Sequence, residues 1–339
     1  MKKRNLYTLL GELVAPASVS GREDGIRSLL AEKLLPFATE VRMDALGNLI
    51  AKKEGRGEAP SVMLCAHMDE IGFLVTFIEE SGMLRVAPVG GIHAAAVAFS
   101  EVVSEKGVAG VIVPEGGVKP ADYAVSKLYI DIGADSRKEA ERKVTVGDCF
   151  SQRSGVRRLM NGRVCGRPLD DRIGCAVLLS LAEELWEEET AGDVYYVFSV
   201  QEEVGCRGAM TAAFGVAPDY GLCFDVTRTG DVPGASPMAC KLGGGAAVKI
   251  KDSSVICHEE VVRELVRLAE EQKIPYQREI LTAGGTDTSS MQLAGSGCRA
   301  GALSIPSRYI HSGVEMCDLK DANACVELAA AFVKEIGKQ

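Results

Sequence analysis

The chain has 339 residues, of which 47% are hydrophobic and 25% are charged, a balance typical of globular proteins with a sizeable core. The net charge of −9 argues against a phosphate-binding surface, so no nucleic-acid partner is expected. The 11 cysteines include no C-x-x-C pair, which indicates reduced thiols in a cytosol rather than a disulfide framework or a Cys-ligated zinc finger.

The sequence also lacks the features of a membrane protein. No run of about 18 apolar residues is present, so no membrane span is expected. The basic start MKKRNLYTLLGELVAP has an apolar stretch broken by Gly11 and Glu12, which argues against a signal peptide. A cytoplasmic location is therefore expected, and the length suits two domains or one large domain with an insertion.

The first 70 residues predict helices and strands in turn. Helical spacing covers 6–35, with a loop inside it, and residues 41–53 predict a hairpin. Residues 62–66 form a short apolar run, which predicts a buried strand. His67 and Asp69 follow this strand directly.

The pattern changes from Ile71 to about Met160. GFLVTFIEESGMLRVAPVGG predicts a hairpin, and GVAGVIVPEGG, KLYIDIG and KVTVGDCF predict further short strands, with one short charged helix at 136–143. Many short strands at close spacing indicate a small barrel or sandwich. We therefore expect residues 71–159 to form an inserted β-rich domain that drives self-association. Residues 1–70 and 160–339 would form one discontinuous catalytic domain.

Strands and helices alternate again after Cys165. Predicted helices cover 172–189, 258–273 and 318–336, and predicted strands cover 194–200, 220–224, 246–251 and 300–305. The helix at 172–189 has an apolar stripe and a polar face. This alternation predicts an α/β fold, specifically a three-layer α/β/α sandwich.

Histidines and carboxylates recur where predicted strands end. The residues in this position are His67, Asp69, Glu202, Glu203, Asp225 and His311, and Asp170 opens a predicted helix. Ligands bind at the carboxyl ends of strands in open α/β sheets. Imidazole and carboxylate ligands together suit zinc, cobalt or manganese. A dinuclear site needs a bridging carboxylate, a His and a carboxylate for each ion, and a free carboxylate as base, and the sequence contains such a set.

Each motif alone has a simpler structural explanation. Asp170 would serve as a helix N-cap, the Glu202–Glu203 pair as a solvated acidic loop, and His67 as a hydrogen-bonded core residue. The remaining histidines, His93 and His258, are interpreted as structural. The combination is more specific than its parts.

The motifs occur in the order H-x-D, L-D-D-R-x-G, Q-E-E-V-G-x-R-G, D-V-T, G-G-T-D and R-Y-I-H-S. This order resembles the aminopeptidases of metallopeptidase family forty-two, the large self-assembling tetrahedral enzymes that include glutamyl and deblocking types. The resemblance covers nearly the whole chain, including IDIGADSRKEAE in the inserted segment. It implies peptide substrates with a free N-terminus and a homo-oligomer, either a dimer or a dodecamer.

The resemblance also implies a role for each position. His67 and Asp225 would bind one divalent ion, Glu203 and His311 a second, and Asp170 would bridge the two, with zinc or cobalt the expected metals. Glu202 would be the general base on a water that bridges the ions, and Asp69 would orient His67. The loop of Gly284, Gly285, Thr286 and Asp287 would line the substrate pocket. The Asp170–Asp171 peptide is expected to be cis.

Two segments depart from the family pattern. Residues 90–95 lack the aromatic and acidic residues expected there, and Gly313 stands where the family commonly has proline. The leading interpretation is a two-metal aminopeptidase. A related metal-dependent deacylase or carboxypeptidase is the alternative enzyme, and a catalytically silent binding protein on the same fold is the alternative outside enzymes. The presence of Glu202 together with all five ligand positions argues against the silent protein.

Overall fold

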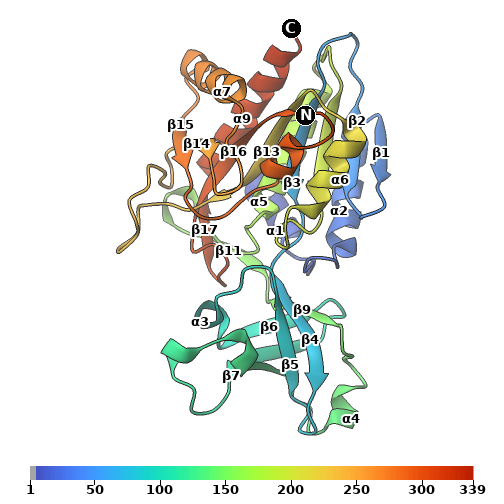
Figure 1. The fold of residues 1–339 in the computed structure, drawn as a ribbon, viewed down its shortest axis with the longest axis vertical. Coiled ribbons are helices and arrows are strands. Elements are labelled where there is room, and N and C mark those ends of the chain that lie inside the picture. Colours follow the sequence, from blue (N-terminus) through green and yellow to red (C-terminus); the bar gives the residue numbers. More distant parts are fainter. Residues whose placement is uncertain (1–4, 339) are drawn as a thin grey trace.

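The computed structural model describes residues 5–338, so the basic start of the chain at 1–4 lies outside the described residues. Figure 1 shows a large α/β body with a smaller β-domain at one end. The helices of the described residues are α1 (Leu6–Leu13), α2 (Asp24–Leu34), α3 (Ala94–Val97), α4 (Arg137–Ala140), α5 (Arg172–Trp186), α6 (Arg207–Val216), α7 (Glu259–Gln272), α8 (Thr288–Gln292) and α9 (Leu319–Ile336). None of the helices between residues 5 and 338 is both long enough and apolar enough to cross a membrane.

The large body is built on a sheet of 11 strands. Its main path runs β1 (Glu40–Met43), β2 (Leu49–Lys53), β12 (Val194–Ser199), β3 (Val62–His67), β13 (Tyr220–Thr227), β16 (Arg299–Arg308), β17 (Glu315–Asp318), β11 (Arg163–Arg167) and β10 (Gly155–Arg158). Two further strands, β14 (Ala246–Lys251) and β15 (Tyr276–Ile280), branch from β16. The four central strands β12, β3, β13 and β16 are parallel, so their carboxyl ends share one edge.

Helices cover both faces of this sheet, because alternate residues of each central strand point to opposite faces. Leu64 and Ala66 of β3 pack into the core beneath α1, α2, α5, α7 and α9. Met63 and Cys65 of the same strand pack into a second core beneath α6 and α8. The predicted three-layer α/β/α sandwich is confirmed.

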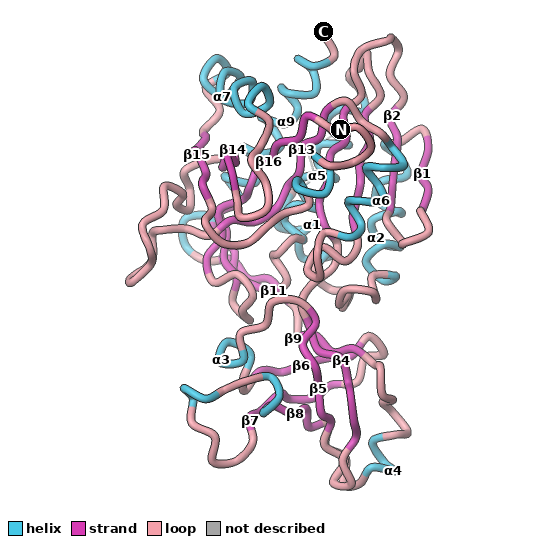
Figure 2. Tube along the Cα trace, in the orientation of Figure 1, coloured by secondary structure: helices cyan, strands magenta, loops and turns pink. Residues whose placement is uncertain are grey.

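The smaller domain is a closed barrel. Its strands follow the order β4 (Gly72–Ile78), β5 (Leu84–Val89), β8 (Leu128–Asp131), β7 (Ala109–Pro114), β6 (Ser100–Ser104) and β9 (Cys149–Gln152). The barrel has its own core, which includes Phe73, Leu84, Ile112, Ile130 and Phe150. Figure 2 shows its strands as a group separate from those of the large sheet. The predicted barrel-like insertion is confirmed.

The domain boundary falls earlier in the chain than the predicted residue 159. The barrel strands end at Gln152, and β10 instead pairs antiparallel with β11 at the edge of the large sheet. The backbone hydrogen bonds of residues 155–158 therefore belong to the sandwich. Residue 159 lies in the turn between β10 and β11, inside the sandwich.

Several predicted elements differ in extent. The strand predicted at 143–150 begins only at Cys149, because 143–148 forms turns against β4. β13 continues past the predicted end at Phe224 to Thr227, paired with β16 throughout. The predicted polar face of α5 is largely absent, since α1, α2 and α9 cover this helix and 11 of its 15 residues are buried. Its Arg172 is buried and donates to the carbonyls of Leu13 and Met68.

Candidate active site

The candidate site lies at the carboxyl edge of the parallel strands. His67 is the last residue of β3, and Asp225 lies near the end of β13. Glu202 and Glu203 follow β12, whereas His311 follows β16. The sheet thus brings residues from separate parts of the chain to one place, as the strand-end pattern predicted.

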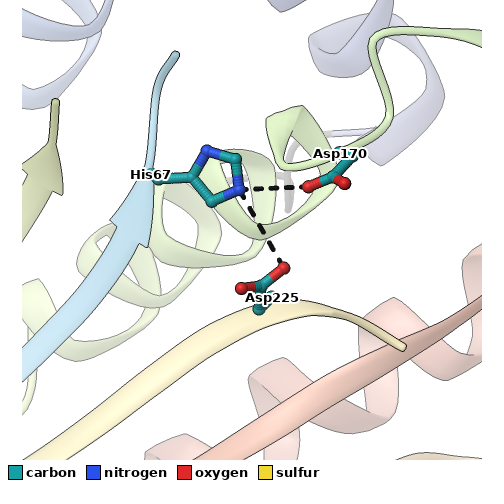
Figure 3. A group of neighbouring side chains, drawn as sticks. All are labelled: His67, Asp170 and Asp225. Atoms are coloured by element: carbon teal, nitrogen blue, oxygen red, sulfur yellow. Dashed lines mark hydrogen bonds and ion pairs between the residues drawn. The ribbon is translucent and has the colours of Figure 1, made fainter. Parts of the chain in front are cut away.

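The first cluster joins His67, Asp170 and Asp225 (Figure 3). The Nε2 atom of His67 lies 3.0 Å from Oδ1 of Asp170 and 4.0 Å from Oδ1 of Asp225. All three side chains are buried. Figure 3 shows both carboxylates facing the same ring nitrogen.

The second cluster joins Asp170, Glu203 and His311. The Nε2 atom of His311 lies 3.2 Å from Oδ2 of Asp170 and 3.2 Å from Oε2 of Glu203. Asp170 therefore presents one oxygen to each histidine. The Asp170–Asp171 peptide is cis, as expected, and Asp171 caps α5 by accepting from the N–H of Gly174.

Asp69 contacts four neighbouring residues at once. Its Oδ1 lies 3.3 Å from Nδ1 of His67 and accepts the N–H of Glu202 at 3.0 Å. Its Oδ2 accepts the N–H of Glu203 at 3.2 Å and the hydroxyl of Ser20 at 2.6 Å. Asp69 thus orients the imidazole and also holds the backbone of the paired glutamates.

Glu315 holds the opposite side of the site and was not identified from the sequence. Its carboxylate accepts the N–H groups of Leu169 at 2.6 Å, Asp170 at 3.2 Å and His311 at 3.0 Å. Burial raises the pKa of Glu315 to about 7, although Arg167 nearby lowers it. These contacts are made to the main chain, so no side-chain motif marks them in the sequence. Ser20 was also not predicted as a site residue, because it lies in a loop that is distant in sequence from the other site residues.

The electrostatics of the cluster follow from burial and close pairing. Burial lowers the pKa of both histidines, but their carboxylate partners outweigh it, so the pKa of His67 is well above its usual value and that of His311 rises to about 11. The hydrogen bonds from the two histidines overcome burial and hold the pKa of Asp170 below its usual value. Burial raises the pKa of Glu202 well above normal, opposed by His67.

The donor set fits a pair of divalent cations. Each cluster provides one imidazole nitrogen and two carboxylates, with ligand atoms within 4.8 Å of one another, and one carboxylate is common to both. Mixed nitrogen and oxygen donors of this kind suit zinc, cobalt or manganese. A cation at either cluster would require the neutral imidazole of its histidine, so cation binding would compete with protons.

A cavity of about 390 Å³ opens beside the clusters. Gly284 and Gly285 line it, whereas Thr286 and Asp287 are buried behind them. The hydroxyl of Thr286 faces Asp252, and Asp287 accepts from the hydroxyl of Ser199. These contacts of Thr286 and Asp287 therefore hold in place the loop that carries Gly284 and Gly285.

The cavity has further lining residues that were not predicted. His93, interpreted from the sequence as structural, lies exposed on the cavity wall, and Cys206 and Arg228 line it as well. Gly91 also lies on the wall, where its carbonyl contacts Nδ1 of His311 at 2.8 Å. The barrel thereby contributes to the site, through the segment between β5 and α3.

Paired imidazole and carboxylate groups beyond the strand ends of a three-layer sandwich are typical of two-metal hydrolases, a class that includes aminopeptidases. The sequence profile of the M42 glutamyl aminopeptidase family matches residues 47–328. The chain therefore belongs to this family of metal-dependent aminopeptidases.

Similar proteins extend over almost the whole chain. A putative aminopeptidase of Acetivibrio thermocellus is 44% identical over 331 residues, which cover 97% of this chain and 98% of that protein. The aminopeptidase APDkam598 from the archaeon Desulfurococcus kamchatkensis has 38% identity and a TM-score of 0.93, with 97% of this chain and 94% of that chain covered. The Pyrococcus horikoshii TET1 peptidase, which assembles into a tetrahedron or a large octahedral shell, has 34% identity, a TM-score of 0.88 and coverage of 98% and 100%.

Proposed function

We propose that this chain is a dinuclear metallo-aminopeptidase that removes N-terminal residues from peptides with a free α-amine. The observation that carries the proposal is the position of Asp170, whose two oxygens face two different histidines. A carboxylate placed in this way is suited to bridge two cations. Zinc and cobalt are the metals that the donor set favours.

The ligands would divide between the two ions around the shared carboxylate. His67 and Asp225 would hold one ion, Glu203 and His311 the other, and Asp170 both. When bound, such ions supply Lewis acidity and lower the pKa of water toward neutrality. Asp69 acts as a positioning residue, because it contacts His67 and the backbone of the Glu202–Glu203 pair but does not reach the substrate cavity.

Glu202 is the proposed general base. Its Oε2 lies 4.0 Å from Nε2 of His67, and its side chain faces the cavity. The carboxylate accepts a proton from the water that attacks the scissile carbonyl, and it then gives this proton to the leaving amine. Burial raises the pKa of Glu202 above its usual value, which makes this carboxylate a better proton acceptor.

The cavity provides space for the first residue of a peptide. Gly284 and Gly285 form a wall without side chains, so the substrate backbone can approach closely there. The free α-amine would be recognised at the metal end of the cavity, where the carboxylates gather. We further propose a homo-oligomer, either a dimer or a dodecamer, in a reducing compartment such as the cytoplasm, where the 11 free cysteines would stay reduced.

A chelation experiment tests the proposal. Dialysis against a chelator should abolish hydrolysis of aminoacyl-nitroanilides, and zinc or cobalt should restore it, with elemental analysis giving two ions per subunit. Full turnover by protein free of metal would refute the metal-dependent mechanism. Equal rates on a peptide and its N-acetylated counterpart would favour a deacylase instead, since an aminopeptidase requires the free amine.

A further inference from the structure

A third group of potential ligands lies beside the two clusters. Glu202, Cys206 and Asp287 each offer one ligand atom, and these atoms all lie within 4.8 Å of one another. The thiol of Cys206 donates to Oε1 of Glu202 at 3.3 Å. Neither Cys206 nor Asp287 has a part in the proposed chemistry, so this group needs its own explanation.

Asp287 has an unused oxygen in this group. Its side chain is buried, with an exposed fraction of 1%. Oδ2 accepts from the hydroxyl of Ser199 and, at 3.7 Å, from the thiol of Cys65, whereas Oδ1 has no hydrogen-bond partner among residues 5–338. A buried carboxylate oxygen without a partner is costly, and a cation held between the three side chains would offset that cost.

Cys206 lies where a ligand can reach it. It precedes α6 with a left-handed backbone (φ 51°) and lines the substrate cavity. One sulfur and two carboxylate oxygens form a donor set for thiophilic cations such as zinc or cadmium. Hard cations such as magnesium prefer oxygen ligands alone. The mixed sulfur and oxygen donors of this group therefore favour zinc and cadmium over magnesium.

We propose that Glu202, Cys206 and Asp287 form an inhibitory site for a thiophilic divalent cation, distinct from the two catalytic positions. Binding forms a metal–sulfur bond and releases the thiol proton to solvent. The inhibitory effect rests on the proposed role of Glu202, because a cation bound to that carboxylate prevents it from accepting a proton. Excess zinc or cadmium would therefore inhibit the enzyme by binding to Glu202, its proposed general base.

The experiment titrates cadmium chloride into the enzyme after it has been loaded with two zinc ions per subunit. Residual aminopeptidase activity and the ultraviolet thiolate-to-cadmium charge-transfer band are recorded together. The wild-type protein should lose activity as the band grows. Magnesium chloride should neither inhibit the enzyme nor produce the band. Cys206→Ser should lack the band, and its activity, expressed relative to its own value without cadmium, should need at least about tenfold more cadmium for half inhibition, given the usual effect of weakening a metal site.

Cys165→Ser is the matched control, because this thiol is also partly exposed but lies on β11 against the carbonyl of Val314. It should behave as the wild type does in both measurements. Cys206→Ala provides a second variant if the serine protein is poorly folded. A band that persists without Cys206, or inhibition that does not change when the band is lost, would overturn the proposal. The band is read without substrate, so it tests the site even in a protein without aminopeptidase activity.

Discussion

At the scale of single residues, the adjacent carboxylates Glu202 and Glu203 have different surroundings. Glu203 is paired with His311 at 3.2 Å, at the centre of the second cluster. Glu202 lies outside both clusters, at 4.0 Å from His67, and accepts a hydrogen bond from the thiol of Cys206. Backbone bonds to Asp69 hold the two residues in these positions, so their roles should be separable by mutation.

Glu202→Gln should keep both metals and lose activity by roughly 10²–10⁴-fold, because an amide cannot accept the proton of water. Glu203→Gln replaces an anionic ligand with a neutral one, so its second metal should bind more weakly and excess cobalt, which is less thiophilic than zinc, should restore part of its activity. Metal content and kcat/KM measured on both variants distinguish the roles. If Glu202→Gln lost metal while Glu203→Gln kept both ions, the two assignments would be reversed.

Arg228 gives the cavity a positive group apart from the metal site. Its side chain is exposed, it lines the cavity, and the described residues give it no ion pair. Arg228→Glu should therefore reduce kcat/KM for Glu-nitroanilide relative to Lys-nitroanilide by about tenfold, or ~1.4 kcal/mol of changed charge interaction. Arg207→Glu, at the exposed start of α6, is the control and should leave the ratio unchanged. If the ratio of kcat/KM for the two nitroanilides were the same in both variants, Arg228 would have no role in substrate selection.

The sequence predicted the groups that converge but not those that hold them in place. His67, Asp225 and His311 were identified because histidines and carboxylates at strand ends must meet at one edge of a parallel sheet. Glu315 and Ser20 were not, since their hydrogen bonds to the backbone and to Asp69 depend on the folded chain. The same reason explains why Thr286 and Asp287 were placed in the substrate pocket rather than behind it.

At the scale of elements, a buried ion pair joins β14 to β15. Lys249 and Glu279 are both fully buried, and the ammonium group of Lys249 contacts Oε1 of Glu279. The hydroxyl of Thr227, at the end of β13, donates to the same oxygen at 2.8 Å. This pair therefore ties the branch of the sheet to a strand that carries Asp225.

Lys249→Met should destabilise the fold by about 3–5 kcal/mol, because it leaves the Glu279 carboxylate buried without its partner. Adding Glu279→Leu should recover part of this loss, limited by the hydroxyl of Thr227, which then lacks its acceptor. Urea unfolding followed by circular dichroism measures each step. The control is Arg153→Met, which breaks an exposed pair with Glu101 and should cost at most about 1 kcal/mol. Equal losses in the two single variants would contradict the argument.

Long apolar elements were predicted well, whereas short or mixed ones were not. α7 and α9 were placed within one residue of their observed bounds, because their apolar spacing is regular. α6, with the sequence RGAMTAAFGV, was not predicted, since small residues give little periodic signal. β10, β11, β15 and β17, each of four or five residues, were missed. Pairing with neighbours in the sheet, rather than local pattern, makes them strands.

At the scale of the whole molecule, the barrel is a separate unit with its own hydrophobic core. It closes on itself through β4 and β9 and has a separate core. Its surface nevertheless exposes large apolar side chains, with exposed fractions of 71% for Phe99, 62% for Val146 and 51% for Phe77. The sandwich also exposes large apolar side chains, such as Leu293 at 77% and Phe214 at 73%, so the proposal that the barrel drives self-association requires a direct test.

Deletion of the barrel tests that proposal directly. Phe73 pairs with Phe150, so the two ends of the inserted segment lie about 5 Å apart, and two glycines can replace residues 72–151. The shortened chain should elute as a smaller species in size-exclusion chromatography with light scattering. It should keep the circular dichroism spectrum of an α/β fold, because the sandwich core lies outside the deleted segment.

Two point variants test the same proposal with the barrel intact. Phe99→Asp, which places a charge on the exposed barrel surface, should reduce the assembly, whereas Phe214→Asp should not, although Phe214 on α6 is 73% exposed. The two phenylalanines are matched in exposure and differ in domain, so the comparison separates the barrel surface from general loss of apolar area. An oligomer of unchanged size after the deletion, or one that only Phe214→Asp disrupts, would assign self-association to the sandwich instead.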